Sequence, residues 1–348
     1  MNIDFIIVGQ GIAGTCFALK LIKEKKKFII FDQHHSNSSS RLALGIYNPL
    51  VLKWFTKAWK VDDQINLFYP FYNFASFLLD EKIIIDRGIY KFLETPYVQN
   101  NWMTKQISSG RQKYMSSKLY SINNSGLMNH DFYGLVQCSG RLKIKLLLNS
   151  FRNFCKKKNI IIQQDFLYQN LIIENNQVSY NGINADNIIF CEGYSGIKNP
   201  YFNNINLKST KGEILTIYCK NLNLKDIIHS GFLFIPIGND RYLFGATYDW
   251  QNINYTCTRT AREKLVLMLD KILNLPYRIL NQVAGIRPST IDRRPLLGAH
   301  TKHNNLYIMN GLGTRGVLLA PYLSNILFNS IYQKTIIPSD ISINRFTS

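Results

Sequence analysis

Residues 3–32 read IDFIIVGQGIAGTCFALKLIKEKKKFIIFD, and this stretch decides the fold of the chain. Its apolar start, residues 3–8, is typical of a buried parallel strand, and the residues that follow predict a helix over 12–23. A second apolar run, residues 28–31, predicts the next strand and ends at Asp32. Strand, glycine turn, helix, strand and acid in this order indicate a fold that binds a dinucleotide.

The turn spells G-x-G-x-x-G, and each glycine meets a separate steric demand. Gly9 allows a tight turn out of the strand, Gly11 lets a pyrophosphate approach bare backbone, and Gly14 lets helix and strand pack closely. The helix presents its first N–H groups, at Ile12 and Ala13, to the phosphates. A tight turn without a ligand is the alternative interpretation.

The residues after this turn supply further candidate cofactor ligands. Asp32 is spaced to accept a hydrogen bond from a ribose hydroxyl, and Gln33 follows it. The polar run HHSNSSSR, residues 34–41, brings hydroxyls and Arg41 beside the phosphates, with Gly45 a few residues on. A solvated surface loop is the other interpretation of this run.

Length and composition predict a folded protein with room for two domains. The chain has 348 residues, 46% of them hydrophobic, and no apolar run approaches the roughly 20 residues of a membrane span. We expect no signal peptide, no membrane partner and a cytoplasmic location. Six scattered cysteines form no C-x-x-C pair and the histidine pairs lack a third ligand, so no metal site or disulfide framework is expected.

The net charge of +19 leaves two causes open. A basic chain is typical of a protein with a polyanionic partner such as RNA. Lys, Asn, Ile, Tyr and Phe also abound, and because AT-rich codons specify all of them, biased base composition alone can produce a basic chain. The lysines among the aromatics near residue 55 are equally ambiguous, since such aromatics either bind single-stranded nucleic acid or pack in a core.

The rest of the chain predicts two interleaved parts. Residues 53–79 are expected to be helical with a break near Pro70, and residues 83–135 to form short strands of a second, sheet-rich domain. Gly193, after an apolar strand, allows a second backbone approach to the cofactor. The other expected elements are helices over 141–157 and 260–273 and strands over 160–163, 187–190, 208–218, 232–236 and 242–248.

A second glycine-rich turn, NGLGTRG, lies between an expected strand at residues 305–309 and a helix that runs to residue 332. A helix N-terminus favours negative charge, which in a flavoprotein develops on the reduced ring. A simple helix entry is the alternative. The candidate cofactor ligands in this turn are Gly311, Gly313, Thr314 and Gly316.

Several motifs follow one another in the order found in a known family: GQGIAG with the acid, FCEGYSG, KGEIL, LFGATYD, GIRPSTIDRRPLLG and NGLGTRGVLLAPY. In these motifs the chain resembles the FAD-dependent D-amino-acid oxidase (DAO) family. That family includes glycine oxidase, sarcosine oxidase and the oxidase domain of the bifunctional enzyme of tRNA 5-methylaminomethyl-2-thiouridine biosynthesis. The stretch SSSRLALGIYNPL is similar to the tRNA-modifying branch.

The resemblance implies an α/β plus antiparallel β fold, in which a Rossmann-like FAD-binding domain is interleaved with a sheet-rich substrate domain. The FAD-binding domain is expected to comprise residues 1–82, 136–206 and 284–348. The substrate domain is expected to comprise residues 83–135 and 207–283. The implied cofactor is FAD.

The resemblance also nominates catalytic residues. Arg287 lies in the G-x-R-P motif, which in several members pairs with a substrate carboxylate, and a guanidinium can clamp a carboxylate at two points. A structural ion pair with Asp292 is the alternative role of Arg287. Tyr248, on the substrate side, and Arg315, in the second glycine turn, are the other candidates. Glu192 stands where the family commonly has a small residue.

The predicted activity is FAD-dependent oxidation of the C–N bond of an amine next to a carboxylate. The substrate is a free small amino acid or, favoured by the SSSRLALGIYNPL stretch, the carboxymethylamino group of a modified tRNA uridine. Molecular oxygen is the expected electron acceptor. A non-catalytic flavin- or RNA-binding protein and a nicotinamide-dependent dehydrogenase are the rival hypotheses. RNA binding is tied to one arrangement, in which the flavin entrance is surrounded by Lys53, Lys57, Lys60, Lys113 and Lys118.

Overall fold

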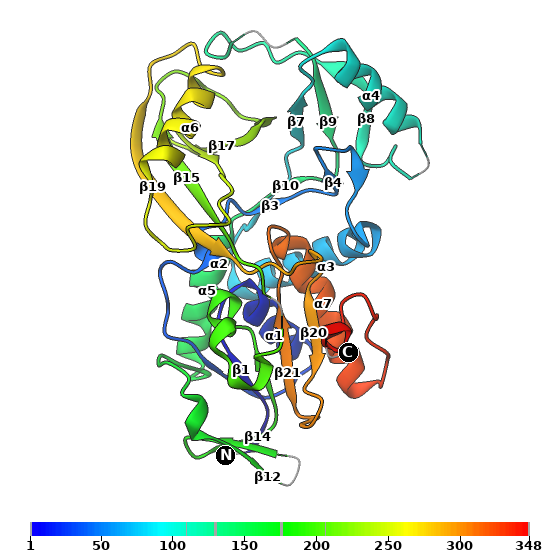
Figure 1. The fold of residues 1–348 in the computed structure, drawn as a ribbon, viewed down its shortest axis with the longest axis vertical. Coiled ribbons are helices and arrows are strands. Elements are labelled where there is room, and N and C mark those ends of the chain that lie inside the picture. The colour runs from blue at the N-terminus through cyan, green and yellow to red at the C-terminus, as the bar shows by residue number, and fades with distance from the viewer. Residues whose placement is uncertain (1, 109, 129–130, 175–176, 206, 347–348) are drawn as a thin grey trace.

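Two large sheets organise the protein, one above the other in Figure 1. The computed structural model describes residues 2–108, 110–128, 131–174, 177–205 and 207–346. The lower sheet contains the first and last strands of the chain. The upper sheet is built from the middle of the chain, as the green, yellow and cyan colours of Figure 1 show.

The lower sheet has a parallel centre. Its strand order is β11-β2-β1-β14-β13-β12, and β21 pairs with β14 and with β20. Strands β11, β2, β1, β14 and β21 run parallel, so their carboxyl ends meet at one edge. The strands are β1 (Asn2–Val8), β2 (Phe28–Phe31), β11 (Ile161–Ile162), β12 (Leu171–Glu174), β13 (Gln177–Tyr180), β14 (Ile183–Phe190), β20 (Leu296–Ala299) and β21 (Leu306–Asn310).

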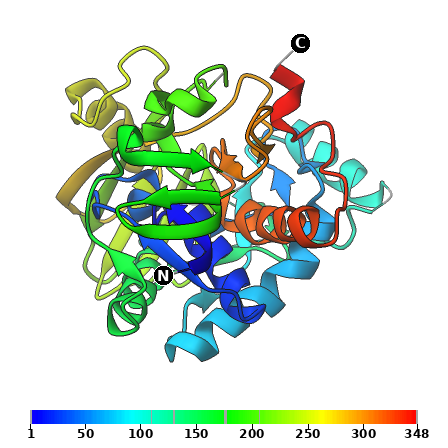
Figure 2. The same cartoon turned by 90° about the horizontal axis from the view of Figure 1, so that it is seen from below.

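Helices α1, α5 and α7 contact this sheet, and α3 packs against α5 and α7, so that one continuous apolar core joins them. Helix α1 occupies Ile12–Lys23, the range that the sequence predicts, and Phe17 on it packs edge-on against Phe5 of β1 at 5.2 Å. Helices α1 and α7 lie side by side, as Figure 2 shows from below. The other members of this layer are α3 (Val61–Leu79), α5 (Ile144–Lys157) and α7 (Gly316–Tyr332).

The upper sheet is almost entirely antiparallel, with the order β19-β15-β18-β17-β16-β7-β9-β8. Helix α6 (Arg259–Asp270) packs Leu265 and Leu269 against Leu215 and Ile217 of this sheet. Its strands are β7 (Ile89–Phe92), β8 (Met115–Tyr120), β9 (Tyr133–Val136), β15 (Thr210–Tyr218), β16 (Ile227–Ser230), β17 (Phe232–Gly238), β18 (Arg241–Gly245) and β19 (Arg278–Arg287).

Short elements connect the two sheets. Helix α2 (Ser39–Leu42) contacts α5 and β19. A small sheet joins β3 (Ile46–Tyr47), β10 (Gly140–Leu142) and β6 (Ile84–Ile85). The predicted domain boundaries stay a prediction, and strand β19 runs across the one placed at residue 284.

The predicted helix over residues 53–79 is wrong in its first part and at its break. Residues Leu50–Val51 and Thr56–Lys57 form the hairpin β4–β5, and α3 begins only at Val61. Two residues of positive φ, Phe55 and Lys60, interrupt any helix there.

Helix α3 continues through Pro70, although a proline removes one backbone hydrogen bond. Phe68 and Tyr72 are buried on either side of Pro70, and their packing holds both turns. Helix α4 (Pro96–Ile107) is a further correction, because only strands and loops were expected between residues 83 and 135.

Among the described residues, no helix is long and apolar enough to span a membrane. The same part of the chain holds no group of three His, Cys, Asp or Glu side chains placed to bind a metal ion.

Candidate functional site

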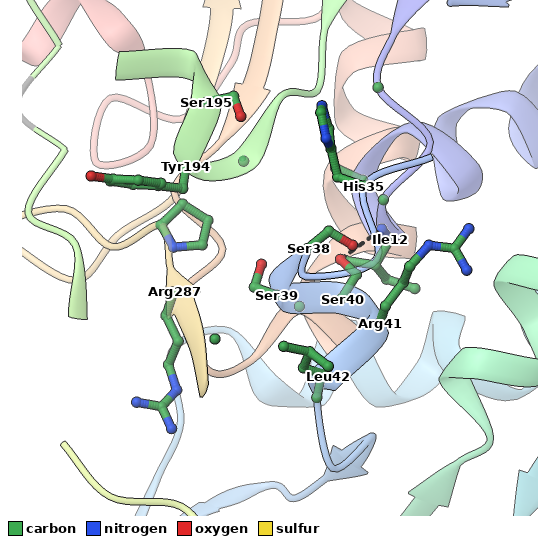
Figure 3. A pocket seen from close by; sticks show the side chains of 18 of the residues that line it. Ile12, His35, Ser38, Ser39, Ser40, Arg41, Leu42, Tyr194, Ser195 and Arg287 are labelled. Carbon is green, nitrogen blue, oxygen red and sulfur yellow. Dashed lines mark hydrogen bonds between the residues drawn. The ribbon is translucent and has the colours of Figure 1, made fainter. Parts of the chain in front are cut away.

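A cavity of about 890 Å³ lies where the two sheets meet. Loops at the carboxyl ends of β1, β2, β14 and β21 line it from below, and strands β15 and β19 line it from above. In Figure 3, His35 and the serines of α2 lie on one side of this space, and Tyr194 and Arg287 lie on the other. A ligand there would touch both halves of the molecule.

Most of the residues that the sequence nominates line this one cavity. Gly14, Gly311 and Arg315 are the nominated residues that do not line it within the described chain. The ones that do are Gly9, Gly11, Ile12, Ala13, Asp32, Gln33, Arg41, Gly45, Gly193, Tyr248, Arg287, Gly313, Thr314 and Gly316.

The turn between β1 and α1 leaves open backbone at the cavity wall. A Cβ added to Gly11 would meet only the side chain of Ser40, 3.2 Å from its Oγ. Ser40 Oγ in turn accepts a hydrogen bond from the Ile12 N–H at 3.0 Å, drawn as a dashed line in Figure 3. Here a helix N-terminus, a hydroxyl and bare backbone meet, a combination that suits a phosphate.

Hydrogen bonds from neighbouring residues hold the Asp32 carboxylate in place. Its Oδ1 accepts hydrogen bonds from Arg152 Nη1 at 2.6 Å and from the His34 N–H at 2.8 Å, and its Oδ2 accepts the Gln10 N–H at 2.8 Å. The sequence analysis missed Arg152, which reaches Asp32 from α5, 120 residues away in sequence. The ribose-binding role of Asp32 stays a prediction.

Arg41 also has partners within the protein. Its Nη1 donates to Asn149 Oδ1 at 2.7 Å, and its Nη2 lies 3.2 Å from His34 Nδ1. Desolvation and the nearby positive charge of Arg41 lower the pKa of His34. The Arg41 guanidinium therefore borders the cavity as a positive charge that is held in a fixed position.

The second glycine turn places another helix N-terminus at the cavity. The Gly313 N–H donates to the Pro288 carbonyl at 2.9 Å, and Thr314 and Gly316 line the wall next to it. The Arg315 side chain is not part of the cavity lining within the described residues. Its two terminal nitrogens donate hydrogen bonds to the carbonyl of Asn48 at 2.9 Å and to that of Leu50 at 2.8 Å. These bonds tie the N-terminus of α7 to residues 48–50, and the catalytic role of Arg315 stays a prediction.

Arg287, at the end of β19, borders the cavity from the upper sheet. Its Nη1 donates to the carbonyl of Thr247 at 3.2 Å, and its guanidinium lies 4.6 Å from the centre of the Tyr248 ring. Burial lowers the pKa of this guanidinium, but arginine stays charged in proteins. Arg287 is therefore a positive charge in a largely enclosed position.

The alternative role for Arg287, an ion pair with Asp292, is wrong. Asp292 instead accepts a hydrogen bond from Arg345 Nε at 2.7 Å, near the C-terminus. Asp292 lies in a turn five residues after β19, where it also accepts a hydrogen bond from the Arg294 N–H at 3.0 Å.

Glu192 follows β14 and stabilises a neighbouring loop. Its Oε1 accepts the Tyr168 hydroxyl at 2.5 Å, and its Oε2 accepts Asn199 Nδ2 at 2.8 Å. Burial raises the pKa of this carboxyl. These contacts explain why a carboxylic acid can stand where the resembled family commonly has a small residue.

Four of the five lysines tied to RNA binding have an acid or an aromatic ring beside them. In the part of the chain that the structure describes, none of the five is among the residues that line the cavity. Lys57 is paired with Asp62, and the ammonium groups of Lys53, Lys113 and Lys118 lie over Trp54, Tyr114 and Tyr120.

The comparisons with known proteins agree with the fold. The family model described as DAO, FAD dependent oxidoreductase, matches residues 4–329. Among curated proteins, glycine oxidase of Bacillus subtilis is 26% identical over 162 residues, which cover 44% of this chain and 42% of that protein. The tRNA 5-methylaminomethyl-2-thiouridine biosynthesis bifunctional protein MnmC of Marinobacter nauticus is 24% identical over 148 residues, which cover 39% of this chain and 24% of that protein.

Solved structures match over almost the whole chain. Glycine oxidase from Bacillus cereus has a TM-score of 0.80 at 19% identity and covers 96% of this chain and 98% of its own. Iminodiacetate oxidase from Chelativorans has a TM-score of 0.79 at 16% identity and covers 97% of this chain and 98% of its own. At these identities the likeness establishes the fold alone.

Proposed function

Because this chain belongs to the FAD-dependent oxidoreductase family, we propose that it oxidises the C–N bond of an amine next to a carboxylate, with FAD held along the cavity. Two neighbours of its fold, glycine oxidase and iminodiacetate oxidase, are named for substrates of this kind. The predicted combination of cofactor and substrate class thus has support from the family and from the site.

The residues around the cavity fit FAD. The backbone of the β1–α1 turn, with Ser40 beside it, would hold the pyrophosphate, and Asp32 would face the ribose. The space over Gly11 would be filled by any larger side chain, which explains the glycine. The N-terminus of α7 would favour the negative charge of the reduced ring.

Bound FAD supplies a two-electron acceptor for the carbon next to the nitrogen. The task left to the protein is to bind and orient the amine. Arg287 would hold the carboxylate, and the walls formed by both sheets would limit the access of water. The imine product then hydrolyses in water. We propose molecular oxygen as the final acceptor, so that hydrogen peroxide should accompany turnover.

The observation that carries the proposal is the placement of Arg287. It is a guanidinium in a largely enclosed position at the cavity, and its carboxylate partner proposed from the sequence, Asp292, is bound elsewhere. A charge in such a position is costly unless it is paired. A substrate carboxylate would supply the missing negative charge.

The test replaces Arg287 with Lys, which keeps the charge but loses the planar fork. The KM for N-methylglycine should rise by roughly 5- to 150-fold, corresponding to about 1–3 kcal/mol for a charged hydrogen bond. Flavin content should not change. Arg345→Lys is the matched control, because Arg345 holds Asp292 outside the cavity lining and its replacement should leave the KM unaltered.

Two outcomes separate the possible errors. An unchanged KM in Arg287→Lys would make Arg287 a structural residue. Failure of the flavin-loaded wild-type protein to oxidise any carboxylated amine would contradict the proposed function itself.

The modified tRNA uridine stays the second candidate substrate, supported by the match to the bifunctional tRNA enzyme. A small amine is favoured by the cavity lining, which within the described chain includes none of the five lysines named for RNA binding. A cytoplasmic location likewise stays a prediction.

A further inference from the structure

Four aromatic residues gather at the cavity beside the upper sheet: Tyr194, Tyr248, Trp250 and Tyr255, here called the aromatic rim. Tyr194, Tyr248 and Tyr255 line the cavity itself. Tyr248 and Trp250 stack with ring centres 5.9 Å apart, and Tyr194 meets Tyr255 edge-on at 6.5 Å. Tyr248, Trp250 and Tyr255 remain 53%, 55% and 41% exposed.

Large aromatic side chains that are exposed to solvent and lie together are unusual on a protein surface. Single exposed apolar residues are common on protein surfaces, whereas two pairs of packed rings at one cavity are typical of a binding site. The local backbone produces the cluster. Thr247 and Asp249 pair with β15, so the alternating side chains of Tyr248 and Trp250 project together from the opposite face.

A buried ion pair fixes the segment that carries three of these rings. The main chain of Lys211 exchanges two hydrogen bonds with Asp249, at 2.9 and 3.0 Å, and Lys211 Nζ donates to Asn254 Oδ1 at 3.1 Å. Glu213, 3.4 Å from Lys211 Nζ, accepts bonds from the Thr258 N–H at 3.0 Å and from its hydroxyl at 2.9 Å. The segment is therefore tied at both ends to β15.

The rim is continuous with the carboxylate-binding position. The guanidinium of Arg287 lies over one face of Tyr248, and Trp250 stacks on the same ring. A substrate that placed its carboxylate at Arg287 would extend the rest of its structure toward these aromatics. A planar ring is the group that gains most there, because flat π-faces stack on Tyr and Trp side chains.

We propose that the substrate carries a planar aromatic or heterocyclic ring beyond its amine, and that the aromatic rim binds this ring. The inference rests on the proposed function, because it assigns the remote part of the same carboxylated amine. It makes Trp250 and Tyr255 specificity-determining residues.

The test compares four N-substituted glycines that share one reacting group. N-methylglycine has no ring, N-benzylglycine has a flat ring, and N-(cyclohexylmethyl)glycine has a ring of similar size that is not flat. N-(2-phenylethyl)glycine, one methylene longer, allows for the reach from Arg287 to the rim. The flavin-loaded wild-type protein should prefer one of the two phenyl substrates to both others by about tenfold in kcat/KM.

Trp250→Ala and Tyr255→Ala should each reduce this preference severalfold, and Trp250→Phe should restore most of it. Trp54→Ala is the matched control. Trp54 is a similarly exposed tryptophan, 60% exposed, on the β4–β5 hairpin and outside the cavity lining. Its replacement should leave the ratio of kcat/KM values as it is in the wild-type protein.

The contrary results are distinct. Equal kcat/KM for the flat and non-flat rings, a preference that survives both alanine variants, or a loss of flavin from these variants would overturn the inference. No turnover of any of the glycines, N-methylglycine included, would instead contradict the proposed function.

Discussion

Two glycines of the first turn differ in what a side chain would meet. A Cβ at Gly14 would lie 1.9 Å from the Gly9 carbonyl oxygen, which belongs to the main chain and cannot move aside. A Cβ at Gly11 would meet only the flexible side chain of Ser40. Gly14 therefore allows α1 to pack closely on β1, and Gly11 leaves open space at the cavity wall.

Gly11→Val and Gly14→Ala should separate these roles. Gly11→Val should purify without flavin, because its methyl groups fill the pyrophosphate space. Its free energy of unfolding, measured in urea on flavin-free protein, should stay within about 1 kcal/mol of wild type. Gly14→Ala should lose about 3 kcal/mol or more, because overpacking against the main chain cannot relax. A Gly11→Val protein with full flavin content would refute the assigned cofactor position.

At the residue scale, sequence reasoning finds what lies in motifs. The glycines of the first turn are recognisable because each stands at a fixed offset from a strand end, and Arg287 is recognisable through the G-x-R-P motif of the resembled family. Arg152 and Lys211 are not recognisable, since each acts on a partner that the fold alone brings near. Their local sequences are typical of any polar helix or strand.

At the scale of elements, the parallel pairing of β16 with β7 encloses a titratable pair. His229 lies opposite Lys91 in this register. Burial, together with the positive charge of Lys91, lowers the pKa of His229 to about 4. Above pH 6.5 the imidazole is neutral in both folded and unfolded chains. Below pH 6.5 the unfolded chain binds a proton at His229, whereas the folded chain binds it only near pH 4. The free energy of unfolding therefore falls as the pH drops from 6.5 to about 4.

Replacing His229 with Gln should remove this part of the acid sensitivity. Between pH 7 and 4.5 the wild-type protein should lose about 2–3 kcal/mol more of its unfolding free energy than His229→Gln does. Urea denaturation at the two pH values measures the difference. Parallel losses in both proteins would show that His229 is charged in the folded state.

Elements with strong apolar periodicity are predictable, and those set by tertiary contacts are not. Helix α1 and strand β2 have the bounds that their sequences predict. Helix α3 runs through Pro70 because buried aromatics on both sides outweigh one missing hydrogen bond. The sequence did not predict helix α4, because its mostly polar residues form no apolar stripe. The one sequence signal for this helix is Thr95, which caps it, followed by Pro96.

At the scale of the whole molecule, the net charge of +19 has two candidate causes, an RNA partner and biased base composition. The lysines expected around the cavity entrance are instead paired with an acid or lie over aromatic rings, Lys60 excepted, and none lines the cavity within the described residues. The placement of these five lysines therefore does not favour an RNA partner, and biased base composition stays a prediction for the cause of the charge.

Salt dependence tests this explanation. Turnover of N-methylglycine should change by less than about twofold between 50 and 200 mM salt, and added tRNA should not inhibit it. A protein that binds nucleic acid through several phosphates would lose roughly 10³-fold in affinity over that range. Inhibition by tRNA at low salt that disappears at high salt would restore the RNA hypothesis.

The fold brings distant segments together at one cavity, and this determines what the whole chain can do. The β1–α1 turn would hold the cofactor from below, while Arg287 and the aromatic rim would hold the substrate from above. The first part was predictable from a local motif. Arg287 and Tyr248 were predictable only through resemblance, because nothing near Arg287 in sequence indicates that a cavity lies beside it, and the sequence did not predict the other three residues of the rim.

The central claim is that a flavin in this cavity oxidises amines that carry a carboxylate. The most direct measurement is the flavin absorbance of the purified protein, followed without oxygen during addition of N-methylglycine or N-methylethylamine, which replaces the carboxylate with a methyl group. We predict that N-methylglycine, or a ring-bearing glycine, bleaches the flavin and that N-methylethylamine at equal concentration does not. Equal bleaching by both amines, or a flavin that no carboxylated amine reduces, would contradict the account.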